Sequence, residues 1–151
     1  MKHQDPRIIV SNAQAVASVD APPEMTRSER LGRGASLLDR HDEPINALRR
    51  IEYMSAYERR ALRGDQTPLS VAFADPVLRE EGLESDRLGD VMDFFQLTDA
   101  DAHRLLCDCH YHGAMTGEGL AKRLRHHIAR SERPSLWSRV QDFVAGRLLH
   151  A

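Results

Sequence analysis

From Asp42 onward, apolar residues recur at steps of three and four positions, the spacing that places side chains on one face of an α-helix. Ile45, Leu48, Ile51 and Met54 follow this spacing in the first such segment. No segment alternates apolar and polar residues over a useful length, as a half-buried β-strand would. The sequence therefore predicts an all-α fold, a single compact bundle of five to six short helices.

Capping residues, prolines and glycines indicate where these helices begin and end. Asp75-Pro76 interrupts the second segment, because the residue before a proline is displaced from the α region. Thr98 and Asp101 are spaced as a capping box directly after the third helix, so a sharp bend must join two helices there. The expected helices span residues 42–64, 67–82 with the interruption, 85–97, 98–113, 116–130 and 134 onward.

The first 41 residues lack this pattern. They contain one short apolar patch, Ile8 to Val10, and a later stretch of helix formers that Gly32 and Gly34 interrupt. Each glycine costs a helix about 1 kcal/mol relative to alanine. We therefore expect residues 1–41 to form an N-terminal tail, partly disordered or ordered only on a partner, and residues 42–151 to form the helical domain.

Composition narrows the class of protein. The 151 residues carry 21 basic and 23 acidic side chains, and this balance disfavours an overall attraction to nucleic acid or to an anionic membrane. No apolar run reaches the roughly 20 residues of a membrane-spanning helix, and the N-terminus lacks the order of residues found in a signal peptide. The two cysteines, Cys107 and Cys109, are too close in sequence for a disulfide framework. We expect a soluble, cytoplasmic domain without membrane contact.

The near-neutral total conceals an uneven distribution of charge. Residues 1–70 carry 11 basic and 10 acidic side chains, residues 71–102 carry 2 and 9, and residues 103–151 carry 8 and 4. The acidic middle segment and the basic C-terminal third either attract each other within the domain or face different partners. Solvated helix faces that happen to differ in charge are the simpler explanation.

Histidines and cysteines, the preferred ligands of zinc, are densest between residues 103 and 112. If the helix expected over 98–113 is continuous, Cys109 points into the core, about 160° around the helix from Cys107, and the two thiols cannot bind one ion. His103, Cys107 and His110 then share one flank. These three are the expected ligands if zinc is bound, and otherwise they form a solvated polar flank. Cys107 is alternatively a thiol nucleophile, although no loop that could form an oxyanion hole accompanies it.

The helix expected over residues 117–130 has a basic face opposite its apolar one. A hydrophobic staple of Met115 and Leu120 indicates where this helix starts, and its glycines favour a close approach of two helices. The basic face resembles the recognition surface of a helix-turn-helix protein that contacts phosphates. Its members, the candidate residues for binding nucleic acid or another partner, are Lys122, Arg123, His126, Arg130 and Arg133.

The favoured function is a small helical protein-interaction or regulatory module without catalytic activity and without a cofactor. A helix-turn-helix-like regulator that binds nucleic acid through residues 117–130 is the first alternative, and a zinc- or thiol-dependent activity around Cys107 is the second. Tyr53 and Tyr57 are expected in the core. The apolar patch at Ile8 to Val10, together with Trp137, would suit a homodimer contact.

Overall fold

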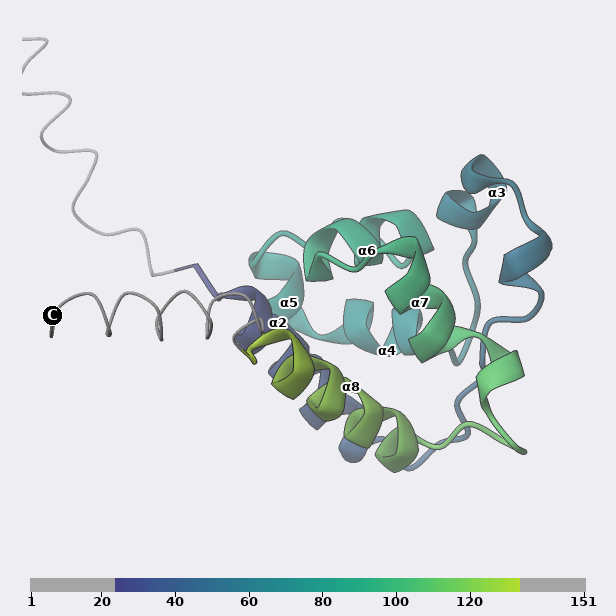
Figure 1. Ribbon diagram of the computed structural model, residues 1–151. Coiled ribbons are helices and arrows are strands. Elements are labelled where there is room, and N and C mark those ends of the chain that lie inside the picture. The colour runs from purple at the N-terminus through teal and green to yellow at the C-terminus, as the bar shows by residue number, and fades with distance from the viewer. Residues whose placement is uncertain (1–23, 134–151) are drawn as a thin grey trace, which may run out of the picture.

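Seven α-helices and two short 3-10 helices make up the part of the chain that the structure describes, residues 24–133, and no strand occurs within it (Figure 1). This computed structural model confirms the all-α fold. The sixth expected helix and the proposed dimer contacts lie outside the described residues. The elements are α2 (Arg27–Asp39), η1 (Ile51–Tyr53), α3 (Ala56–Ala61), α4 (Pro68–Ala74), α5 (Pro76–Glu80), α6 (Leu88–Phe95), α7 (Asp99–Leu106), η2 (Asp108–His110) and α8 (Gly117–Ser131).

Helix α2 corrects the expectation of a tail for residues 27–39, whereas residues 1–23 of that expected tail lie outside the part of the chain that the structure describes. The Thr26 side chain accepts a hydrogen bond from the Glu29 backbone, and the Glu29 carboxylate accepts one from the Thr26 backbone, so a complete capping box begins the helix. Leu31, Ala35 and Leu38 are buried in the common core, and α8 packs along α2 (Figure 1). This tertiary packing offsets the low helix propensity of the glycines.

Gly117 begins α8 against the C-terminal end of α2. An ideal Cβ on Gly117 would lie 2.1 Å from the Leu38 carbonyl oxygen and 3.2 Å from that of His41, so only glycine fits there. The close approach expected of the glycines in this segment is therefore confirmed. Met115 and Leu120 are both buried, as the staple predicted.

The long helix predicted over residues 42–64 was wrong. The backbone of Leu48 instead bonds to the segment that follows α7: its N–H donates to the Leu106 carbonyl (2.8 Å), and its carbonyl accepts from the Asp108 N–H (3.0 Å). Helical structure returns only in η1 and α3, where Ser55 forms a capping box with Glu58. The same change places Tyr53 and Tyr57 outside the core, at 82% and 84% exposure.

Helices α4, α5 and α7 begin at the caps and prolines that the sequence predicted, whereas α6 begins at Leu88, later than the expected residue 85. Thr67 and Asp75 cap α4 and α5, each of which starts at a proline, and Thr98 caps α7 through the predicted box with Asp101. Phe94 and Phe95 in α6 are both buried, with their rings packed edge to face. Helices α4 to α7 thus form the part of the fold that holds α7 against α8.

Three aspartates of the acidic segment pair with arginines of α3 and the loop after it, and Asp101 pairs with Arg104 of the basic C-terminal third. Arg60 contacts Asp93 at 2.5 Å, and α3 packs beside α6 in Figure 1. Two further pairs are Arg59 with Asp99 (3.1 Å) and Arg63 with Asp86 (3.3 Å). The expected attraction between the acidic segment and the basic C-terminal third is therefore limited to one ion pair among the described residues, and three of the other partners come from residues 59–63.

Candidate functional site

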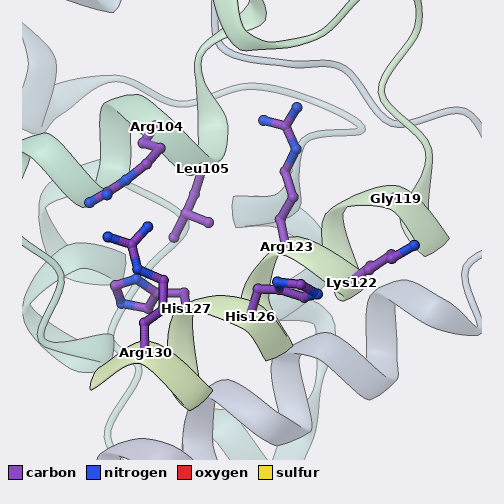
Figure 2. A pocket seen from close by; sticks show the side chains of 8 residues that line it. All are labelled: Arg104, Leu105, Gly119, Lys122, Arg123, His126, His127 and Arg130. Carbon is purple, nitrogen blue, oxygen red and sulfur yellow. The ribbon is translucent and has the colours of Figure 1, made fainter. Parts of the chain in front are cut away.

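A pocket of about 450 Å³ lies between α7 and α8, and most of the residues that line it are basic. Figure 2 shows Arg104 and Leu105 entering from α7 and the other side chains rising from α8. Four of the five expected binding residues line it, and Arg133 does not. The lining residues are Arg104, Leu105, Gly119, Lys122, Arg123, His126, His127 and Arg130.

The cations of this pocket are largely without carboxylate partners. Arg104 is the exception, because it pairs with Asp101 on its own helix at 2.6 Å. Neither Lys122 nor Arg130 forms an ion pair with any of the described residues, and no carboxylate lines the pocket. The pocket therefore offers an anion several positive charges that are not already neutralised.

Arg123 is held in place by two contacts beyond α8. Its guanidinium donates to the His110 carbonyl at 2.5 Å and lies over the Tyr111 ring, 4.0 Å from the centroid. The Tyr111 hydroxyl in turn donates to the Leu105 carbonyl at 2.5 Å. These contacts fix one wall of the pocket and connect it to η2.

His127 lies at the other end of the pocket, beside Arg104 and Arg130 (Figure 2). Burial and the positive charges of Arg27, Arg104 and Arg130 lower the pKa of His127, against the opposing effect of Asp101. The neutral ring accepts a hydrogen bond at Nε2 from Arg27 (2.8 Å). At neutral pH its 3.8 Å approach to Asp101 is therefore not an ion pair.

Contrary to the expectation, the histidines and cysteines near residue 107 do not lie on one helix, because α7 ends at Leu106. Cys107 takes an extended conformation (φ −74°, ψ 137°) where its segment lies beside Leu48. The expected placement of the thiols is reversed, with Cys107 fully buried and Cys109 exposed. A helix that continues through Cys107 and Cys109 would have kept the two thiols from binding one ion. Because the helix ends before them, that exclusion does not apply.

The turn after α7 brings both thiols and both imidazoles into one cluster. Cys109 Sγ lies 3.1 Å from Cys107 Sγ and 3.5 Å from His103 Nε2. His110 Nε2 lies 3.1 Å from His103 Nδ1. We call His103, Cys107, Cys109 and His110 the His/Cys cluster.

The thiol-nucleophile alternative gains no support from this geometry. Burial first, together with hydrogen bonds to Cys109, Glu52 and Asp108, raises the pKa of the Cys107 thiol to about 12, so near neutral pH the sulfur is a protonated thiol. Catalysis requires the thiolate. Asp99, which would have oriented His103, pairs instead with Arg59 at 3.1 Å.

Sequence reasoning missed Arg104 and misplaced Cys109. Arg104 follows His103 on a helix with a correctly predicted start, so its outward direction was derivable, but its position beside Arg130 depends on how α8 docks (Figure 2). Cys109 was misplaced because the helix was extended too far. No local signal marks its true end, which is set by the contact with Leu48.

No protein-family model, curated protein or solved structure matches this chain. None of the described helices is long and apolar enough to cross a membrane. The two candidate sites are therefore interpreted from their geometry and chemistry.

Proposed function

We propose that this protein is a non-catalytic interaction module that binds an acidic segment of a protein partner in the basic pocket between α7 and α8. The observation that carries the proposal is that Arg104, Lys122, Arg123 and Arg130 all line one cavity that no carboxylate lines. Grouping like charges is unfavourable in the free protein, and an anion relieves it. Complementary charge of this kind sets partner choice and association rate.

The shape of the pocket favours a peptide that has apolar as well as acidic side chains. Leu105 is buried at the base, and the aliphatic stems of the long basic side chains form much of the remaining wall. A volume of about 450 Å³ is large enough for one or two side chains of a partner. We expect carboxylates at the rim and an apolar side chain against Leu105.

A duplex of nucleic acid fits the site less well. A recognition helix must project into a groove of the duplex, whereas α8 packs along α2 and its cations face a cavity shared with α7. These features favour a peptide chain over a duplex.

Fluorescence anisotropy with a short labelled peptide of Glu-Glu-Leu repeats tests the proposal. Replacing both Lys122 and Arg130 with glutamine should weaken binding by about tenfold or more, equivalent to about 1.4 kcal/mol. Arg125→Gln is the matched control, since Arg125 carries the same charge on the same helix but contacts Asp39 outside the pocket. That variant should bind the peptide like the wild type.

Two results would overturn the proposal. One is peptide binding that the double substitution leaves unchanged. The other is tighter binding to a duplex DNA than to the peptide, with a salt dependence between about 50 and 200 mM that becomes shallower in the double variant, as loss of phosphate contacts requires. That second result would establish the nucleic-acid function instead.

A further inference from the structure

We infer that the His/Cys cluster is a binding site for a zinc-class transition-metal ion, with His103, Cys107, Cys109 and His110 as its four ligands. This site is separate from the basic pocket and does not depend on the pocket's proposed ligand. It is a Cys2His2 donor set, a combination that zinc prefers and uses in structural sites.

The distances between the donor atoms are close to those of a zinc site. A tetrahedral zinc ion, with bonds of about 2.3 Å to sulfur and about 2.0–2.1 Å to nitrogen, holds its ligand atoms about 3.3–3.8 Å apart. The 3.5 Å from Cys109 Sγ to His103 Nε2 falls within this range. One donor atom each from His103, Cys109 and His110 lie within 4.8 Å of one another, and Cys107 Sγ lies 3.1 Å from Cys109 Sγ, so side-chain rotations would have to bring the four donors onto one ion.

The backbone explains why these four residues meet. His103 lies in the last turn of α7, and the extended Cys107 breaks the helix so that η2 turns Cys109 and His110 back toward it. The bonds of Leu48 to Leu106 and Asp108 fix this break on both sides of Cys107. The fold therefore holds the ligands together without help from an ion, which favours a preformed site.

The charges around the cluster supply an independent argument for a cation. The Cys107 thiol donates to Glu52 Oε2 at 3.3 Å and approaches Asp108 Oδ1 at 3.5 Å. Within residues 24–133, neither carboxylate forms an ion pair with lysine or arginine. Glu52 also lies within 4.8 Å of both His103 and Cys107 through its donor atoms. A divalent cation would offset two of the four negative charges that these carboxylates and two thiolates carry.

Binding would replace the thiol protons by bonds from sulfur to the metal, with both protons released to solvent. The exposed Cys109 gives the ion a route to the buried Cys107. The His110 carbonyl already accepts the Arg123 guanidinium, so one ligand is oriented from α8. Such outer contacts commonly fix the ligands of metal sites.

Metal content and cobalt spectroscopy test the site. The protein is purified under a thiol-free phosphine reductant, loaded with Zn²⁺, dialysed and analysed for metal. We expect about one equivalent in the wild type and at least a tenfold lower occupancy in Cys109→Ser and in His110→Ala. Loading with Co²⁺ should produce a sulfur-to-cobalt charge-transfer band that Cys109→Ser loses. His112→Ala is the matched control, because His112 is exposed in the same loop and outside the cluster.

Cys109 is the cysteine to replace first, because its side chain is exposed and its loss leaves the core intact, as unchanged helical circular dichroism would verify. The inference is overturned if the wild type retains no stoichiometric zinc and shows no cobalt–sulfur band. It is also overturned if Cys109→Ser and His110→Ala retain as much metal as the wild type. Neither readout involves the acidic peptide, so failure here leaves the proposed function standing.

Discussion

The arginines around α3 and the basic residues of α8 carry the same charge in different surroundings. Arg59, Arg60 and Arg63 each contact an aspartate of the segment from 86 to 99. Lys122 and Arg130 contact no carboxylate among the described residues and face a cavity. The charges of the first group are neutralised by ion pairs within the fold, whereas the charges of the second group remain available to a ligand. The number of basic residues alone does not distinguish a structural role from a binding role. The presence or absence of a carboxylate in contact with each basic side chain does.

The basic residues of α8 face the cavity only because α8 lies close against α2. Gly117→Ala should disturb that position more than any other substitution considered below. The new Cβ would lie 2.1 Å from the Leu38 carbonyl oxygen, so α8 must move away from α2. We expect the free energy of unfolding to fall by about 2–4 kcal/mol, as in other overpacked sites, measured by urea denaturation. Gly32→Ala is the control, because nothing lies within 4 Å of its ideal Cβ, and it should stabilise α2 by about 0.5–1 kcal/mol. Equal stability of Gly117→Ala and the wild type would contradict the close approach.

The next largest effect concerns the partly buried ion pair of Asp75 with Arg33. Asp75 is 7% exposed, caps α5 and accepts two bonds from Arg33, at 2.5 and 3.0 Å. Asp75→Asn should lower the free energy of unfolding at pH 7 by about 2–4 kcal/mol, because Arg33 then loses its charged partner.

The effect of Asp75→Asn should also depend on pH. The hydrogen bond from Arg33 holds the pKa of Asp75 below its ordinary value. Its contribution is therefore fully present above the unfolded-state pKa of about 3.9 and is lost as the pH falls through the lower folded-state pKa. Urea denaturation at pH 7 and near pH 3 should show a smaller difference between variant and wild type at the lower pH. A difference that grows as the pH falls would refute this assignment.

Exposed pairs should contribute little by comparison. Asp93 is 67% exposed at its side chain, and Asp93→Asn should change the free energy of unfolding by only about 0–1 kcal/mol. The Lys122→Gln, Arg130→Gln double variant should be as stable as the wild type or more stable by a few tenths of a kcal/mol, because it removes repulsion without breaking a pair. A clear loss of stability in that double variant would mean that these cations belong to the fold, and the contrast between the two groups would fail.

The smallest effect is a shift in the pKa of His127. Burial and three arginines, Arg27, Arg104 and Arg130, lower this pKa, and Asp101 opposes them. An acidic peptide in the pocket should raise the pKa by up to about one unit, since it adds negative charge beside the ring. Imidazole resonances followed by NMR, with and without the Glu-Glu-Leu peptide, measure it. An unchanged pKa at saturating peptide would place the peptide elsewhere.

The sequence predicted helices well where a local cap or proline decides their ends. Thr98 with Asp101, Thr116, and the prolines at 68 and 76 all begin helices as expected. It failed at Leu48 and Cys107, because the bonds between their segments join residues far apart in the chain. Two omissions were avoidable, since Thr26 with Glu29 and Ser55 with Glu58 are also capping-box spacings. The sequence grouped most of the pocket residues, but not Arg104, which only the docking of α8 brings to them.

The contact between Leu38 and Gly117 has a consequence for the order in which the protein acquires its structure. The ribosome synthesises α2 early and α8 late. Until α8 emerges, the apolar face of α2 formed by Leu31, Ala35 and Leu38 lacks the helix that mainly covers it. Pairing between such distant segments slows folding and leaves hydrophobic surface open to aggregation. The nascent chain is thus most vulnerable after the residues of the His/Cys cluster have been synthesised and before the α8 residues of the basic pocket have been.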